Sequence, residues 1–259
     1  MSDDEVRDCW DANAEVWARQ VRRGYDRYRL HYNNPAFFAL VGDLEGLDVL
    51  DAGCGEGYNT RLFARGGAQV TGVDISSEMI ALARAEEAGE TLGIRYEVAS
   101  VSNLSMFGDG SFHAIVSTMA LMDCADYEGA LGEFARVLRP GGMLAFSILH
   151  PCFMKAFRGW ERDADGRVVG VRLGDYFGPS VEREQWTFSA APDAQDVEPF
   201  CVVYFLRTLA EVLNPLAARF RLEAVVEPQA SEAACEAECR LAKLRLIPQT
   251  LMIRARKPA

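Results

Sequence analysis

Apolar and polar positions follow a regular rhythm in the middle of the chain. Between residues 47 and 149, short apolar runs alternate with segments whose apolar residues recur at helical spacing. Unbroken apolar runs are typical of strands covered on both faces. This order predicts an α/β protein, with a mostly parallel sheet and helices on both of its faces. The expected strands are 47–52, 68–74, 94–98, 112–117 and 143–149, and the expected helices between them are 58–65, 77–88 and 127–138.

The flanking regions have other patterns. Residues 1–45 carry Trp10, Trp17 and Val21 at helical spacing, and Pro35 suits the first turn of a second helix. Residues 151–200 are rich in glycine, proline, tryptophan and charge, and we interpret them as an insertion with its own elements. A helix over 202–217, a strand over 221–226, a short helix within 231–243 and a strand over 250–256 are expected to follow. The expected domains are a helical cap at 1–45, a core at 46–150, an insertion or lid at 151–200, and a C-terminal helix with the last two strands at 201–259.

Composition narrows the classes of protein. The 259 residues hold 27 Lys and Arg against 38 Asp and Glu, a net charge of −11, which argues against a nucleic-acid partner. No apolar run is long enough to span a bilayer, and the acidic start lacks the features of a secretory signal. Seven irregularly spaced cysteines are typical of reduced thiols. We therefore expect a cytoplasmic protein with no metal site, no membrane partner and no nucleic-acid partner.

A glycine loop follows the first expected strand. The run Asp51-Ala52-Gly53-Cys54-Gly55-Glu56-Gly57 spaces its glycines by two and two. A dinucleotide fingerprint would need a further glycine where Tyr58 or Thr60 stands, and no Gly-Lys-Ser/Thr follows as in a phosphate loop. Glycines still allow a sharp turn and close approach of a ligand to the backbone. The Asp51 carboxylate would repel a pyrophosphate and suits a cationic ligand.

The second expected strand ends in another acid. Asp74 lies at the same sheet edge and can accept hydrogen bonds from both vicinal hydroxyls of a ribose. Ile75 and Met79 follow, where they can pack against a purine. The pattern therefore indicates a nucleoside with no phosphates and a positively charged tail. S-adenosylmethionine meets both requirements.

Three motifs together resemble those of the class I S-adenosylmethionine-dependent methyltransferases, small-molecule type. They are residues 49–57, Gly72-Val73-Asp74-Ile75-Ser76, and Arg136-Val137-Leu138-Arg139-Pro140-Gly141-Gly142. The resemblance implies a Rossmann-like sheet of order 3-2-1-4-5-7-6 with the last strand antiparallel. It also implies S-adenosylmethionine as cofactor and S-adenosylhomocysteine as product.

The same resemblance implies roles for individual residues. Ser100 stands where many members have an aspartate that contacts the adenine, and His113 stands where an acid is usual. Tyr28 or Arg29 would meet the methionine carboxylate. The full set of expected cofactor-binding residues is Tyr28, Arg29, Asp51, Gly53, Cys54, Gly55, Asp74, Ile75, Met79, Ser100, Val101, Thr118 and Met119.

The acceptor side is defined less sharply. His150 ends the fifth expected strand and is either a general base or a hydrogen-bonded structural histidine. The expected acceptor-binding residues are Trp17, Asp123, Cys152, Trp160 and Tyr176. Aromatic residues of the insertion equally suit a small core of its own.

The leading hypothesis is transfer of a methyl group from S-adenosylmethionine to an O, N or C atom of a small molecule by in-line displacement. Within the same class, the alternative is a tRNA or protein methyltransferase. Outside the class, the alternative is a non-catalytic S-adenosylmethionine-binding protein. The sequence leaves the acceptor and the oligomeric state open.

Overall fold

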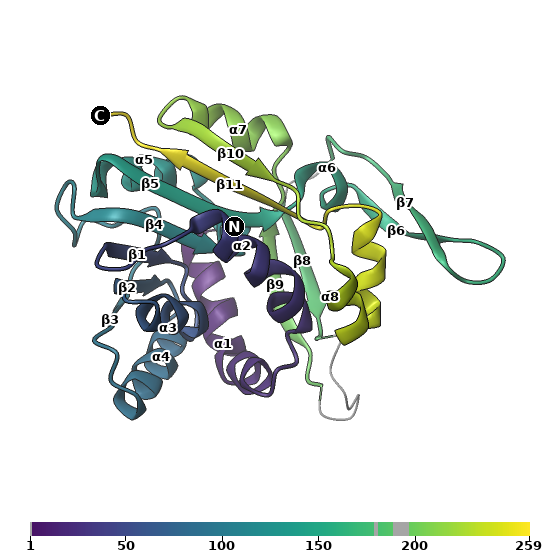
Figure 1. Cartoon of the computed structure of the whole chain (residues 1–259), viewed down its shortest axis with the longest axis horizontal. Helices are drawn as coiled ribbons and strands as arrows, with labels where there is room; N and C mark the ends of the chain where they lie inside the picture. The colour runs from purple at the N-terminus through teal and green to yellow at the C-terminus, as the bar shows by residue number, and fades with distance from the viewer. Residues whose placement is uncertain (1, 179–180, 189–196) are drawn as a thin grey trace.

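A seven-stranded sheet forms the centre of the protein in a computed structural model that describes residues 2–178, 181–188 and 197–259 (Figure 1). The strand order is β10-β11-β5-β4-β1-β2-β3. Strands β1 to β5 are parallel, whereas β11 is antiparallel to both β5 and β10. This confirms the order and the antiparallel last strand expected from the sequence. The strands are β1 (Asp48–Ala52), β2 (Gln69–Asp74), β3 (Arg95–Val98), β4 (Phe112–Thr118), β5 (Leu138–Leu149), β10 (Arg221–Val226) and β11 (Thr250–Arg256).

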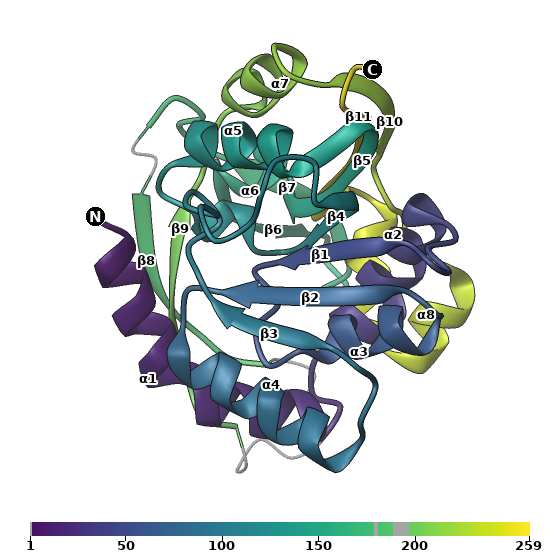
Figure 2. The same cartoon turned by 90° about the vertical axis from the view of Figure 1, so that its left-hand side faces the viewer.

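Helices cover both faces of this sheet (Figure 2). Phe37 of α2 (Asn34–Val41) and Phe63 of α3 (Tyr58–Arg65) pack with strand residues on one face. Phe134 of α5 (Tyr127–Val137) and Leu216 of α7 (Leu209–Ala217) pack on the other. Leu50 and Ile115 of the central strands are fully buried, as the unbroken apolar runs predict.

Helix starts are fixed by side-chain caps that the sequence contains. Ser76 accepts a hydrogen bond from the Met79 N–H at the start of α4 (Ser77–Gly89) and so acts as its N-cap. Asp126 caps α5 in the same way, through the N–H of Gly129.

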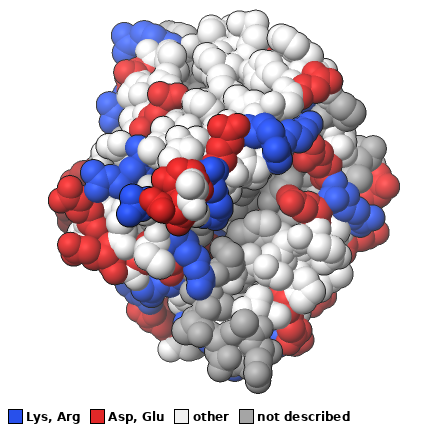
Figure 3. Space-filling model, turned by 90° about the vertical axis from the view of Figure 1, so that its right-hand side faces the viewer, with Lys and Arg blue, Asp and Glu red and all other residues white. Residues whose placement is uncertain are grey.

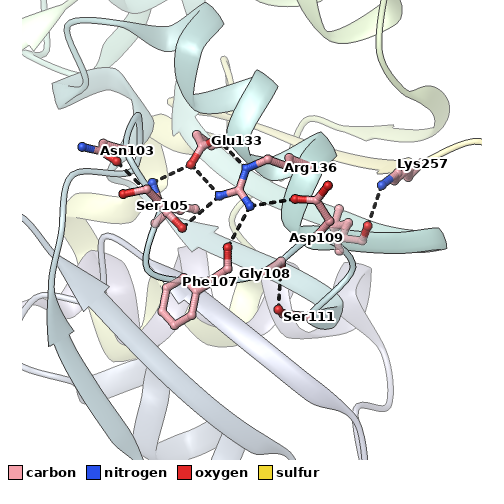
Figure 4. A network of polar contacts seen from close by, with 11 residues as sticks. Asn103, Ser105, Phe107, Gly108, Asp109, Ser111, Glu133, Arg136 and Lys257 are labelled. Atoms are coloured by element: carbon pink, nitrogen blue, oxygen red, sulfur yellow. Dashed lines mark hydrogen bonds and ion pairs between the residues drawn. The ribbon is translucent and has the colours of Figure 1, made fainter.

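Arg136, in the third motif, holds the connection between β3 and β4 against α5 (Figure 4). Its guanidinium donates to the carbonyl oxygens of Leu104 and Phe107 and pairs with Glu133 and Asp109. Glu133 in turn accepts from the Leu104 N–H at 2.7 Å. The motif therefore stabilises the loop that precedes β4 and takes no part in the cavity described below.

The fifth strand is longer than expected. It begins at Leu138, which pairs with Phe112, and the next pair is Met143 with Ala114. The intervening Arg139–Gly142 segment is accommodated by a register shift, in which Gly141 takes a φ of 73°. Sequence patterning gives no sign of this shift, because proline and two glycines normally end a strand.

The described part of the insertion contains two antiparallel strand pairs and a short helix, α6 (Pro151–Met154). Strands β6 (Phe157–Arg162) and β7 (Val168–Leu173) make an arm that projects from the body (Figure 1). Strands β8 (Val181–Trp186) and β9 (Phe200–Phe205) pair with each other, and β9 lies against α1 (Asp3–Arg22).

The expected helix over 202–217 is wrong at its start. Residues 202–205 belong to β9, where valines and aromatic side chains pair across to β8. The helix α7 begins at Leu209, after a capping box in which Thr208 and Glu211 satisfy each other's backbone N–H groups. The residues Thr208 and Glu211, three positions apart, are the sequence signal that marks the start of α7.

The remaining described elements are short helices and helical turns outside the sheet. A π-helical turn, η1 (Arg29–Asn33), leads into α2, and the 3-10 turn η2 (Leu121–Asp123) follows β4. The expected short helix within 231–243 is divided into α8 (Glu232–Ala237) and the 3-10 helix η4 (Cys239–Arg245). No described helix is long and apolar enough to cross a membrane.

Candidate active site

Two glycines of the loop between β1 and α3 have different surroundings. Gly53 has a φ of 78°, and a Cβ there would lie 2.4 Å from the Ala120 Cβ. Gly55 also has a positive φ, but a Cβ there would meet no atom within 4 Å. Gly53 is therefore required by packing against the loop after β4. Gly55 borders open space in which a ligand can approach the main chain.

That space is a cavity of about 350 Å³ at the carboxyl ends of the central strands. Ligands of open parallel sheets bind at this edge. It extends from the loop after β3 across β2, β1 and β4, and α1 and β9 contribute to its walls. All thirteen residues expected to bind the cofactor line it: Tyr28, Arg29, Asp51, Gly53, Cys54, Gly55, Asp74, Ile75, Met79, Ser100, Val101, Thr118 and Met119.

Asp74 joins the glycine loop to the start of α4. One carboxylate oxygen, Oδ2, accepts from the Gly55 N–H at 2.8 Å, and Oδ1 accepts from the Ser76 N–H at 2.9 Å. Burial raises the pKa of Asp74, while these two backbone donors act to lower it. Each oxygen has a second lone pair for a ligand hydroxyl.

Asp51 is buried one strand away. Its Oδ2 accepts from the Thr60 hydroxyl at 2.7 Å. Burial raises the pKa of Asp51 to about 7, because the Thr60 hydrogen bond and the nearby Arg29 charge only partly offset the loss of solvent. A cationic ligand would favour the charged form of this carboxyl group.

Arg29 supplies a positive charge to the same part of the cavity. Its Nε lies 3.1 Å from Asp26 Oδ2, and its guanidinium lies 5.4 Å from the Tyr58 ring centroid and 5.7 Å from that of Trp17. The arginine is thereby held between aromatic faces and one acid. A ligand carboxylate near Asp51 would therefore find a positioned counter-charge.

Further along, the wall of the cavity is aromatic. Trp17, Trp186 and Phe200, which we call the aromatic wall, have ring centroids 4.9 to 6.4 Å apart. Asp123 lies in the same cavity, is 8% exposed, and its Oδ1 has no hydrogen-bond partner among the described residues. Burial raises the pKa of Asp123 well above its usual range, and the Trp10 indole opposes part of that shift. Of the expected acceptor-binding residues, the structure brings Trp17 and Asp123 to the cavity.

The other three expected acceptor-binding residues lie outside the lining of the cavity. The Tyr176 hydroxyl accepts from the Leu209 N–H at the start of α7. Trp160 lies behind Lys243, whose Nζ is 5.1 Å from its ring centroid. Cys152 belongs to α6, where its N–H donates to His150. Each of the three has contacts that stabilise the insertion.

His150 is also placed away from the cavity lining, at the start of α6. Its Nδ1 accepts from the Cys152 N–H at 3.2 Å, and its Nε2 lies 2.7 Å from Glu227 Oε1. Both ring nitrogens are thus engaged, and the residue is 2% exposed. This geometry supports the structural interpretation of His150 over the general-base interpretation.

Replacing His150 by alanine is expected to lower the free energy of unfolding by about 0.5–2 kcal/mol, because a helix cap is lost. Binding of S-adenosylhomocysteine and the rate per folded molecule should not change. Thermal unfolding, calorimetric titration and turnover measured on the same preparation check this. A turnover loss beyond the loss of folded protein would contradict it and restore the general-base hypothesis.

Several lining residues were not expected from the sequence. Asp3 of α1 reaches the loop after β3, where its Oδ2 accepts from the hydroxyls of Ser100 and Ser102 at 2.7 and 3.2 Å. Lys243 and Gln249 reach the cavity from near the C-terminus. No local motif marks these residues, since only the packing of α1 and η4 brings them to the sheet edge.

These features fit a phosphate-free adenosyl sulfonium. The glycine loop leaves room at Gly55, Asp74 offers acceptors for ribose hydroxyls, and Asp51 suits a cation. Fold and cavity together define a nucleoside-binding Rossmann-like domain.

Comparisons with known proteins agree. Residues 50–146 match the family described as "Methyltransferase domain". Over 174 residues, the chain is 37% identical to the ubiquinone biosynthesis O-methyltransferase of Xanthomonas oryzae, covering 65% of this chain and 73% of that protein. It is 37% identical over 127 residues to the malonyl-[acyl-carrier protein] O-methyltransferase of Pectobacterium atrosepticum, and spans about half (48%) of the length of that relative and of this chain.

A solved structure agrees as well. The S-adenosylmethionine-dependent methyltransferase from Mesorhizobium loti superimposes with a TM-score of 0.69 at 32% identity, covering 86% of this chain and 96% of that one. The chain belongs to the S-adenosylmethionine-dependent methyltransferases. S-adenosylmethionine is its cofactor.

Proposed function

We propose that the protein transfers the methyl group of S-adenosylmethionine to a small molecule held beside the aromatic wall. The observation that carries this proposal is the continuity of one cavity from the glycine loop to Trp17, Trp186 and Asp123. Helix α1 and strand β9 border it, which favours an acceptor small enough to be enclosed. Both O-methyltransferase relatives named above support methyl transfer to a heteroatom.

The bound cofactor supplies a methyl carbon on a cationic sulfur. The residues of the chain position the acceptor in line with that carbon and exclude water. In its carboxylate form, Asp123 would accept the acceptor's proton at Oδ1, a buried oxygen with no partner among the described residues, and its raised pKa makes that carboxylate a stronger base. Cys152, Trp160 and Tyr176 would then act by holding the insertion around the acceptor.

Surface charge favours a small acceptor over a nucleic acid. Figure 3 shows Lys and Arg interspersed with Asp and Glu over the side of the molecule that lies on the right in Figure 1. The net charge of −11 adds a general repulsion for phosphate backbones. We place the reaction in the cytoplasm, as the seven free cysteines support.

The test uses cofactor labelled in the methyl group. The purified protein is incubated with it and, separately, with a small-molecule filtrate, total tRNA and total protein from bacterial cells. Label is expected in the small-molecule fraction, with formation of an equal amount of S-adenosylhomocysteine. Label in tRNA or protein alone would replace this proposal by the corresponding alternative. Tight cofactor binding without label in any fraction would indicate a non-catalytic binding protein.

A further inference from the structure

Lys243 lines the cavity and has no acidic partner among the described residues. Its Nζ lies 5.6 Å from the ring centroid of Tyr28 and 5.1 Å from that of Trp160. Two aromatic faces therefore hold the ammonium by cation–π contact. They occupy part of its surroundings, yet offer no acceptor for its three N–H donors.

The other cation of the cavity has a different position and different partners. Arg29 is paired with Asp26, and it is the cation that lowers the pKa of Asp51. Arg29 thus serves the cofactor end of the cavity, whereas Lys243 packs against Trp160 of the insertion and against Tyr28.

The cavity lining also contains a buried polar atom that has no partner among the described residues. Gln249 lines the same cavity, and its side-chain oxygen is buried with no hydrogen-bond partner among the described residues. Its backbone N–H donates to the Tyr32 hydroxyl at 3.1 Å, which fixes the residue beside the cluster that contains Tyr28 and Trp160. The cavity lining therefore includes an ammonium without an acidic partner and a carboxamide oxygen without a hydrogen-bond partner in the described part of the chain.

We propose that Lys243 binds a carboxylate of the acceptor, so that the enzyme selects an aromatic carboxylic acid. This rests on the proposed function and names the substrate class of the same site. The aromatic wall provides flat surfaces for a ring, and an ammonium held between aromatic faces interacts strongly with an anion.

A single negative charge fits better than two. The cavity is also lined by Asp51, Asp74 and Asp123, and its one cation without an acidic partner in the described part of the chain is Lys243. A phosphate monoester would bring about two negative charges to one ammonium in a negatively charged environment. A carboxylate brings one, which the ammonium neutralises.

The experiment measures binding of matched probes to protein saturated with S-adenosylhomocysteine. The probes are benzoate and its 3-hydroxy and 4-hydroxy derivatives, the three corresponding benzamides, and phenyl phosphate. We expect at least one carboxylate to bind fivefold or more tightly than its amide, and this preference to fall as ionic strength rises. Lys243→Met should reduce the preference below twofold and leave the affinity for S-adenosylhomocysteine unchanged.

Arg240→Met is the matched control, since Arg240 lies on the same 3-10 helix, outside the cavity lining, and pairs with Glu238. It should keep the preference. The inference is overturned if no carboxylate is preferred to its amide, if both variants lose the preference equally, or if phenyl phosphate binds most tightly. A fall in S-adenosylhomocysteine affinity in Lys243→Met would assign Lys243 to the cofactor instead. Failure of wild-type protein to bind S-adenosylhomocysteine would contradict the proposed function itself.

Discussion

Replacing Asp74 by alanine is expected to weaken binding of S-adenosylhomocysteine at least tenfold. The carboxylate would hold ribose hydroxyls, and charged hydrogen bonds of this kind contribute about 1.5–3 kcal/mol each. The same change removes the acceptors that fix the Gly55 N–H and the Ser76 N–H. Isothermal titration calorimetry measures the affinity, and circular dichroism shows whether the variant is folded.

Asp74→Asn separates these two contributions. The amide keeps the shape of the side chain and one oxygen, so an intermediate affinity is expected. Glu78→Ala, a change on the exposed part of the neighbouring helix α4, should bind like the wild type. A folded Asp74→Ala protein with nearly normal affinity would rule out the ribose assignment.

The affinity for S-adenosylhomocysteine should fall about tenfold between pH 8 and pH 6, because only about a tenth of a group with a pKa near 7 stays charged one unit below it. The ligand's ammonium favours the Asp51 carboxylate, so binding lowers the pKa of Asp51 and releases a proton near neutral pH. Acid therefore opposes binding. Calorimetry across this pH range gives the slope directly.

Asp51→Asn is the control for that slope. It should bind weakly at pH 8 and show a flatter pH dependence than the wild type. Equal slopes in the two proteins would assign the effect to another group. In the protein without ligand, stability depends on pH in the opposite direction to ligand affinity. Because the pKa of Asp51 is raised by folding, the contribution of Asp51 to stability falls as pH rises from about 4 to about 7.

Much of the fold followed from local patterns. The five parallel strands were predicted because each is covered on both faces and therefore reads as an apolar run. Helices between them begin at capping residues that are local in sequence, as Ser76 shows for α4. The insertion was different. Its strands β8 and β9 bury aromatic residues against α1, which is nearly 200 positions away in the sequence. The Cys201 N–H of β9 also donates to Asn13 Oδ1 of α1 at 3.1 Å. The same valines and aromatic residues read equally well as part of the helix that follows.

The sequence by itself determined that the expected cofactor-binding residues would share one cavity, because Asp51, the glycine loop and Asp74 stand at the ends of adjacent strands, and adjacent strand ends meet at one edge. For the proposed acceptor half, the sequence indicated Trp17 and Asp123, and only the tertiary structure added Lys243 and Phe200. These residues come from segments with no fixed spacing, and the packing of α1, β9 and η4 brings them to one cavity. His150 lies at the N-cap of α6 and outside the cavity lining where it was expected. The order of the strands determines where the residues at their carboxyl ends lie. Contacts between segments that are distant in the sequence determine which other side chains cover the cavity.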